Sequence, residues 1–237
     1  MKLFNENLIL ADVVSENHLL FPVINRLGVN LGFKNSTIKT ICAENKIDIE
    51  FFIEIINVFN NENYFPQKKL QQFSVSTIIN YLNKTHEFYR NYYIAEIDKL
   101  IKQLLNNDNI ESKSIRKFYQ NYQNELIEHL KFEENIVFPY IVELSESAMS
   151  KLSNKVKIKY SITDFEKEHS NIDNKISDLR NFILRYLPVS YDFNTCNSLL
   201  SALFLFEKDL QNHTRIEEKI IRFKFYYEAR INRKKNK

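Results

Sequence analysis

Residues 125–140 read ELIEHLKFEENIVFPY, and this segment sets the interpretation of the whole chain. His129 and Glu133 are four residues apart, so on an α-helix their side chains share one face, one turn apart. The same spacing recurs at His213 and Glu217. A repeated His-x-x-x-Glu lets a helix offer one nitrogen and one oxygen ligand to a metal ion. A single pair would be weak, because many solvated helix faces carry one by chance.

The composition favours long helices. Among 237 residues there are only two glycines and four prolines, so chain breakers are scarce and a turn-rich sandwich is disfavoured. The formal net charge is +3. This excess is too small to predict a nucleic-acid or membrane partner.

The cysteines and the N-terminus indicate a compartment. Cys42 and Cys196 stand alone, without the spacing of a disulfide framework, which is typical of a reducing environment. The N-terminal segment MKLFNENLILADVV carries polar and acidic residues too early for a signal peptide. No apolar run approaches the roughly 20 residues that a membrane span requires. We therefore expect a cytoplasmic protein.

The hydrophobic pattern predicts two domains. Residues 1–62 read as a small helical domain, interrupted near Gly28 and Gly32 and ending in a longer helix over IDIEFFIEIINVFN. The polar segment NNENYFPQKKLQQ, which contains Pro66, reads as a linker. Residues 74–230 then form the second domain.

Four amphipathic patterns fill this second domain, each with core-facing residues at alternating spacings of three and four. The four stripes are Val75, Ile79, Leu82, His86, Tyr89, Tyr93, Ile97, Leu100 and Leu104; Phe118, Tyr122, Glu125, His129, Glu133, Ile136 and Tyr140; Ile162, Phe165, His169, Ile172, Ile176, Leu179 and Ile183; and Leu203, Phe206, Leu210, His213, Glu217 and Ile220. Connections are expected at 106–109, around 144–156 and at 187–192, where Pro188 stops a helix. This pattern is typical of an all-α, up-down-up-down four-helix bundle.

Each stripe contains one histidine. Antiparallel helices joined by short loops place residues at equal height when they lie equally far from the shared turn. Counted in this way, the four histidines differ in height by about 3 Å at a rise of about 1.5 Å per residue. We therefore expect them to meet in one layer of the bundle interior.

A metal site explains this layer better than an ordinary core. One histidine on an apolar face is usually a core residue with a backbone or carboxylate partner, but burying unpaired carboxylates beside four imidazoles is costly. Six donors are too many for one tetrahedral zinc and suit two ions, with the glutamates bridging. Mixed ligation of this kind in a bundle favours iron, with manganese as the alternative. The predicted ligands are His86, His129, Glu133, His169, His213 and Glu217.

Neighbouring carboxylates are candidates for supporting these ligands. Glu125 and Asp209 each precede a ligand histidine by one turn, and Glu166 lies three residues before His169. Carboxylates at these positions could accept the free imidazole N–H and fix its tautomer, or they could be ordinary surface acids. Asp173 is a candidate for an additional ligand.

Other residues near the stripes have simpler interpretations. Tyr89 and Tyr93 follow His86 on the same face and either line a cavity or belong to the core. His18 lies outside the bundle stripes and is interpreted as structural. The basic segment from Arg222 to Lys237 reads as a solvated helix end.

These residues resemble the hemerythrin-like, HHE cation-binding superfamily, and more narrowly the Repair of Iron Centres family of di-iron, iron–sulfur cluster repair proteins. That family has a short helical N-terminal domain and then a bundle with the ligand order His, His-x-x-x-Glu, His, His-x-x-x-Glu. The segment HLKFEENIVFP is especially close to the family's His…Glu-Glu…Phe-Pro form. Oxygen-carrying hemerythrins use five histidines, whereas this bundle offers four, which argues against a reversible oxygen carrier.

The N-terminal domain departs from this family. A Cys-Cys-Gly-Gly motif is usual there, but the corresponding run LGVNLGFKN places Gly32, Phe33, Lys34 and Asn35 at the motif. Cys42, in the following helix STIKTICAENKIDIEFF, does not occupy it. The resemblance therefore does not extend to a thiol-dependent step.

The resemblance implies a non-heme di-iron protein of the nitrosative or oxidative stress response. It would bind or reduce nitric oxide, or supply iron to damaged clusters, with a small diatomic or peroxide ligand and iron–sulfur proteins as partners. The alternative is a di-iron sensor for oxygen or nitric oxide that acts through a protein partner. The oligomeric state stays open.

Overall fold

The structure, a computed structural model, describes residues 3–150, 162–188 and 190–235; within these helices the side chains of residues 144, 146–150, 162–171 and 219–235 are not described. The chain divides into two compact units, Met1–Thr85 and His86–Lys237. The boundary lies inside helix α6 (Val75–Phe88), later in the chain than the predicted limits of 1–62 and 74–230 place it. Each unit is considered by itself.

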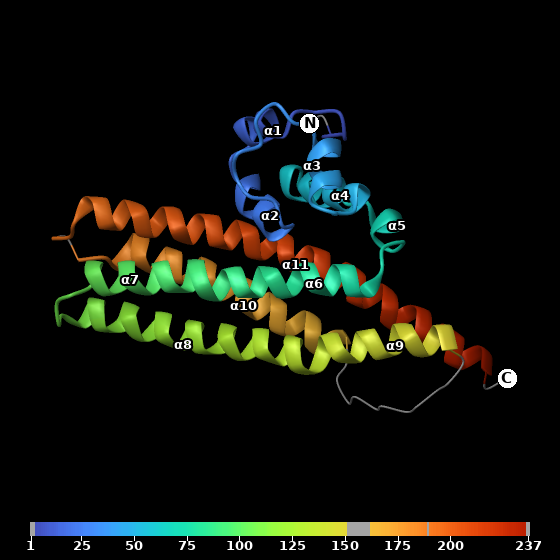
Figure 1. Cartoon of the computed structure of the whole chain (residues 1–237). Helices are drawn as coiled ribbons and strands as arrows, with labels where there is room; N and C mark the ends of the chain where they lie inside the picture. Colours follow the sequence, from blue (N-terminus) through green and yellow to red (C-terminus); the bar gives the residue numbers. More distant parts are fainter. Residues whose placement is uncertain (1–2, 151–161, 189, 236–237) are drawn as a thin grey trace. The chain divides into compact units, whose positions relative to one another are not determined.

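The first unit is built from short helices. They are α1 (Leu10–Glu16), α2 (Leu20–Arg26), α3 (Ile38–Glu44), α4 (Ile49–Asn60) and α5 (Gln67–Leu70) (Figure 1). The side-chain oxygens of Thr37 and Asp48 accept backbone N–H groups in the first turns of α3 and α4, which fixes where these two helices begin. The predicted helix over IDIEFFIEIINVFN is confirmed as α4. The segment STIKTICAENKIDIEFF, described above as a helix on the family's pattern, contains a break, because Lys46, at φ 55°, separates α3 from α4.

The polar segment after α4 is packed rather than free. Glu54 of α4 is buried and accepts hydrogen bonds from the Tyr64 hydroxyl and the Lys69 ammonium group, each at 2.5 Å. Leu70 of α5 is also buried. The predicted linker therefore lies within the first unit, where two of its side chains satisfy a buried carboxylate.

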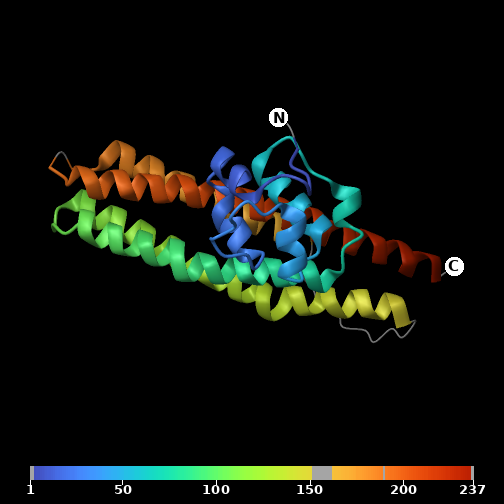
Figure 2. The same cartoon turned by 45° about the horizontal axis from the view of Figure 1, so that its top comes forward.

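The second unit consists of long helices that pack side by side (Figures 1 and 2). One helix begins in the first unit as α6, and its continuation from His86 through the π-helical segment η1 (Tyr89–Ile94) into α7 (Ala95–Leu104) belongs to the second unit. The next runs from α8 (Ile110–Phe132) through a second π-helical segment, η2 (Glu133–Val137), into α9 (Phe138–Ser150). Helices α10 (Ile162–Tyr186) and α11 (Phe193–Lys235) follow. Helix α11 packs on α7 and α10, and α10 packs on α8.

The described residues confirm the predicted all-α class, since they contain no β-strand beyond an isolated bridge between Ile9 and Thr37. The connections predicted at 106–109 and 187–192 are also confirmed by the ends of α7 and α10. The connection predicted around 144–156 begins too early, because α9 runs to Ser150; residues 151–161 lie outside the described ranges.

The π-helical segment η2 changes the predicted register of its helix. Ile136 was expected to face the core but is 44% exposed, whereas Val137 and Phe138 are buried. A π turn accommodates one extra residue relative to an α-helix, so the buried positions after Glu133 fall one residue later than a regular helix predicts. The sequence pattern assumed a regular helix and missed this shift.

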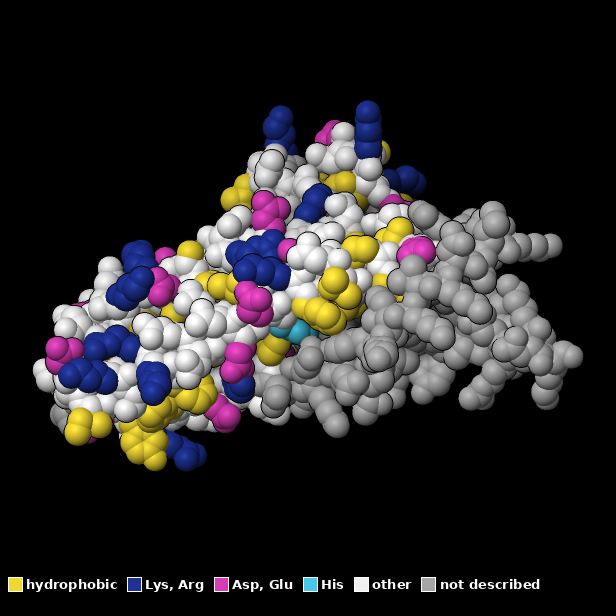
Figure 3. Space-filling model, turned by 90° about the horizontal axis from the view of Figure 1, so that it is seen from below, with side chains coloured by type: hydrophobic (Ala, Val, Ile, Leu, Met, Phe, Trp, Pro, Cys, Tyr) yellow, Lys and Arg dark blue, Asp and Glu magenta, His cyan; other side chains and the backbone are white. Residues whose placement is uncertain are grey.

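The surface of the described residues is mixed in charge. In Figure 3, lysine and arginine side chains alternate with acidic ones over the visible described face. Within the described ranges, no helix combines the length and the apolar character needed to cross a membrane.

Candidate metal centre

Three buried side chains from separate helices meet inside the second unit. His86 comes from the last turn of α6, Glu133 opens η2, and His213 lies in the middle of α11. The Nε2 atoms of His86 and His213 are 3.1 Å apart, and the Nε2 atom of His86 is 3.5 Å from a carboxylate oxygen of Glu133. Their ligand atoms all lie within 4.8 Å of one another, close enough to share a metal ion.

Two further predicted donors extend this cluster. The Nε2 atom of His129 is 3.0 Å from the other carboxylate oxygen of Glu133, and the Nε2 atom of His213 is 3.3 Å from Glu217. These pairs are the two His-x-x-x-Glu motifs, each on one helix face. The structure thus connects five predicted donors in the order His129, Glu133, His86, His213 and Glu217. The sixth, His169, has no described side chain, so its place in the cluster stays a prediction.

The chemistry of these donors fits metal ions. Glu133 and Glu217 are both 0% exposed, and two carboxylates without a cation would be costly to hold there. Burial lowers the pKa of His213 although the nearby Glu217 raises it, and a lowered pKa favours the neutral imidazole that binds metals. Buried imidazole and carboxylate donors together suit iron or manganese better than a thiolate-preferring ion.

A second layer of contacts orients His86. Its Nδ1 atom is 3.1 Å from the Oε1 atom of Glu134, and Arg90 donates to the same oxygen at 2.7 Å. Burial raises the pKa of Glu134, but the hydrogen bonds to His86 and Arg90 outweigh it, so the pKa is lowered. The Phe138 ring stacks on the His86 imidazole, with centroids 5.5 Å apart. Together these groups hold the imidazole in one orientation, as partners of metal-binding histidines do.

Sequence reasoning missed Glu134 and Arg90 as functional residues. Two signals were available: a second glutamate follows Glu133 as Glu218 follows Glu217, and Arg90 lies one helical turn after His86. Neither signal shows which histidine on another helix the carboxylate meets.

The predicted supporting carboxylates have other partners. Glu125 is exposed and forms an ion pair with Lys175 of α10. Asp209 is buried but accepts a hydrogen bond from the Tyr89 hydroxyl at 3.0 Å, and the Nδ1 atom of His213 has no hydrogen-bond partner among the described residues. In this structure Asp209 therefore contacts Tyr89, and it makes no hydrogen bond to the Nδ1 atom of His213. The side chain of Glu166 is outside the described residues.

The two predicted cavity-lining tyrosines form a packed wall beside the cluster. Tyr89 is fully buried, and its ring centroid is 5.6 Å from that of His213. Tyr93 is 5% exposed and stacks on Phe206 at 4.9 Å. Asp173, the candidate additional ligand, lies close enough to Tyr122 to contribute to the raised pKa of that phenol, after burial.

Both π-helical segments lie next to predicted metal ligands in the sequence. Segment η1 begins three residues after His86, and η2 begins at Glu133 itself. A π turn widens the helix locally, which is one reason such segments concentrate at functional sites. At η2 the buried positions after Glu133 shift by one residue, whereas through η1 the expected core positions Tyr89, Tyr93 and Ile97 stay buried.

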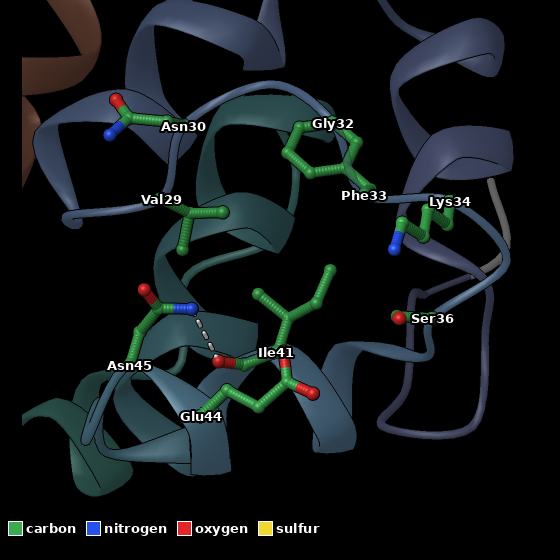
Figure 4. Close-up of a pocket in the computed structure, with 9 residues that line it drawn as sticks. All are labelled: Val29, Asn30, Gly32, Phe33, Lys34, Ser36, Ile41, Glu44 and Asn45. Carbon is green, nitrogen blue, oxygen red and sulfur yellow. Dashed lines mark hydrogen bonds between the residues drawn. The ribbon is translucent and has the colours of Figure 1, made fainter.

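The loop that replaces the cysteine motif lines a small pocket in the first unit. The pocket has a volume of about 280 Å³ (Figure 4) and is lined by Val29, Asn30, Gly32, Phe33, Lys34, Ser36, Ile41, Glu44 and Asn45. Cys42, in the adjacent α3, is buried, and burial followed by the charge of Asp48 raises its pKa to about 11. Such a thiol is not a ready thiolate nucleophile or metal ligand.

Comparisons with known proteins agree with this geometry. Residues 77–225 match the hemerythrin HHE cation binding domain. The chain is also 20% identical over 225 residues to the iron-sulfur cluster repair protein ScdA of Staphylococcus haemolyticus (strain JCSC1435), an alignment that covers 93% of this chain and 98% of the relative. The predicted donors, from His86 to Glu217, all fall within the matched domain. The chain therefore belongs to the hemerythrin HHE cation-binding family.

Proposed function

We propose that this protein holds a pair of iron ions in its bundle and acts in the repair of iron–sulfur clusters under nitrosative or oxidative stress, in the cytoplasm. The observation that carries the proposal is the contact series from His129 through Glu133, His86 and His213 to Glu217. It joins donors of three helices around two buried carboxylates. The relative that covers nearly the whole chain is named as an iron–sulfur cluster repair protein, which supports the direction of the proposal.

In this proposal the six donor side chains are divided between two metal ions. The four histidines would supply nitrogen donors, and Glu133 and Glu217 would supply carboxylate oxygens. When bound, an iron pair supplies a site that changes oxidation state and takes up a small diatomic or peroxide ligand. The fit of the donor set leaves manganese as the competing metal.

The remaining residues hold the site in place and keep it dry. Phe138 stacks on the His86 imidazole, Tyr89 meets the His213 imidazole edge to face, and both aromatic rings are buried. Arg90 and Glu134 fix the orientation of His86 through its Nδ1 atom. Exclusion of water strengthens the electrostatic interaction between the carboxylates and a bound cation.

Metal analysis tests the proposal directly. Protein purified from iron-supplemented cells should contain about two irons per chain by the donor count, and an oxo-bridged ferric pair should absorb in the near ultraviolet. His129→Ala should remove that absorption, whereas His18→Ala, which changes an exposed histidine of the first unit, should retain it. Protein that binds manganese under equal supply, or no metal, would contradict the iron assignment.

A sensor is the second candidate, favoured by the state of the cysteines. Both cysteines of the chain are buried, and burial raises the pKa of each thiol. Neither is therefore poised for a thiol-dependent repair step. Anaerobic, reduced protein given excess nitric oxide separates the two functions. Catalytic formation of nitrous oxide supports an enzyme, and a single stoichiometric adduct without turnover supports a sensor.

A further inference from the structure

Three tyrosines of η1 form a continuous aromatic path between the metal centre and the surface. The Tyr89 ring is fully buried, with its centroid 5.6 Å from that of His213. Tyr89 and Tyr93 are 6.1 Å apart between centroids, and Tyr93 and Tyr92 are 5.3 Å apart. Tyr92 is 53% exposed. Each ring therefore contacts the next, from a ligand histidine to solvent.

The Tyr89 hydroxyl has a partner that can take its proton. It donates to a carboxylate oxygen of Asp209 at 3.0 Å, and Asp209 is only 7% exposed. A phenol that loses an electron becomes a strong acid, so its oxidation requires a base within hydrogen-bond reach. A carboxylate supplies such a base.

Tyr119 provides the contrast. It is as deeply buried, but its hydroxyl donates to the backbone carbonyl of Ile94 at 3.1 Å. A peptide carbonyl accepts a hydrogen bond but is too weak a base to take the proton. The two tyrosines thus differ in the one property that oxidation requires.

We propose that Tyr89 is a redox-active residue that passes single electrons between the metal centre and the surface at Tyr92. This inference rests on the proposed metal-binding function. With peroxide as the oxidant, Tyr89 gives one electron to the metal centre and its hydroxyl proton to Asp209, which breaks the O–H bond. Reduction of one hydrogen peroxide to two waters takes two electrons and two protons, so two such one-electron transfers through Tyr89 serve each peroxide, and solvent supplies the two protons.

The same path restores Tyr89. A small outer-sphere one-electron reductant such as ascorbate supplies an electron at the exposed Tyr92, and the electron reaches Tyr89 across the Tyr93 ring. The proton then returns from Asp209 to Tyr89. Each cycle therefore moves one electron from the reductant to the metal centre and leaves the tyrosines unchanged. The path protects the ligands, because oxidising equivalents leave the site without attacking an imidazole.

Freeze-quench electron paramagnetic resonance tests the proposal. Iron content and the optical spectrum are recorded first, and the iron-loaded protein is then mixed with hydrogen peroxide. Wild type should show a neutral tyrosyl radical. The chain has no tryptophan, so the radical can be assigned to a tyrosine, and the variants below distinguish Tyr89 among the 13 tyrosines. Tyr89→Phe and Asp209→Asn should lose the signal. Tyr119→Phe is the matched control and should retain it. Tyr92→Phe should form the radical but lose it more slowly when ascorbate is added.

A second arm does not need iron. Photo-oxidised ruthenium tris-bipyridine removes an electron at the surface of the metal-free protein, and the radical should settle on Tyr89 in wild type but not in Tyr89→Phe. Radical signals that are equal in wild type and Tyr89→Phe in both arms overturn the electron path. Normal iron binding without any tyrosyl signal overturns the path alone. A protein that binds no iron overturns the proposed function, and the photo-oxidation arm then decides the role of Tyr89.

Discussion

The two halves of the helical bundle bury different kinds of side chain. Among the described residues, the distal half, around Leu100, Ile115, Leu179 and Leu199, buries a large hydrophobic cluster. The site half buries imidazoles and carboxylates from His86 to Glu217. Apolar side chains stabilise by burial alone, whereas buried charged groups lose hydration that only a well-placed partner offsets. We infer that the distal half supplies the stability that lets the other half hold charged ligands.

The first test of this comparison changes a residue in the half that contains the candidate metal centre. His213→Ala should abolish metal binding, because this imidazole contacts both His86 and Glu217 and lies at the centre of the cluster. Elemental analysis of purified variants measures the effect. Retention of a full metal complement would show that the cluster is only a polar core.

A large-to-small change in the distal half should act on stability instead. Leu179 is fully buried in the hydrophobic core, so Leu179→Ala should lower the free energy of unfolding by about 2–5 kcal/mol. Chemical denaturation measures this loss, and the folded variant should keep its metal content. If Leu179→Ala lost metal with an unchanged free energy of unfolding, stability and metal binding would not be divided between the two halves.

The contacts around His86 should have an intermediate effect. Glu134→Gln keeps the size of the side chain but weakens the hydrogen bond to the Nδ1 atom of His86, and metal affinity should fall about 10–100-fold. Titration against a competing chelator measures the affinity. An affinity equal to that of wild type would mean that Glu134 only pairs with Arg90 and does not support metal binding.

The carboxylate of Glu134 should also make the free energy of unfolding depend on pH. Because its pKa is lowered from the ordinary value of 4.5, Glu134 contributes stability that is complete above that value and is lost as the pH falls through the lower folded-state pKa. The difference in unfolding free energy between wild type and Glu134→Gln should therefore be constant near neutral pH and shrink below about pH 4.5. Denaturation of the metal-free proteins at several pH values measures it; a difference that grows in acid would contradict the sign.

The smallest effect is expected at Glu125. This side chain is half exposed and pairs with Lys175, so Glu125→Gln should change the unfolding free energy by less than about 1 kcal/mol and leave metal affinity unchanged. Glu134→Gln, measured in the same assays, is its matched counterpart. A fall in affinity at Glu125 would restore the role in orienting His129 that the sequence predicts.

Much of this organisation could be predicted from the sequence. The helical period and the height of each histidine along the bundle follow from counting residues along one helix. The two His-x-x-x-Glu pairs needed only a regular helix between their members. The common height of His86 and His213 followed from the distances of the histidines to the turns, an argument that holds when connections are short. Such arguments fix the height of a side chain along the bundle.

Other contacts could not be predicted, because they depend on rotation about the helix axis. Asp209 lies one turn before His213, yet it bonds to Tyr89 from another helix. Glu134, next to Glu133 in sequence, reaches His86 across the interface. Ile136 turned outward because η2 adds a residue that no hydrophobic period signals. In each case packing between helices decided the partner.

The π-helical segment η2 also makes one position of the chain tolerant of shortening. Asn135 is exposed there, and its side-chain amide donates to the backbone carbonyl of Lys131 at 2.7 Å. Deleting Asn135 would let the wide turn close into ordinary α-helix, with Val137 and Phe138 still directed inward. A deletion in the regular part of α8 would instead rotate every later side chain by about 100°. We therefore expect that the chain can lose one residue at this point without moving Glu133.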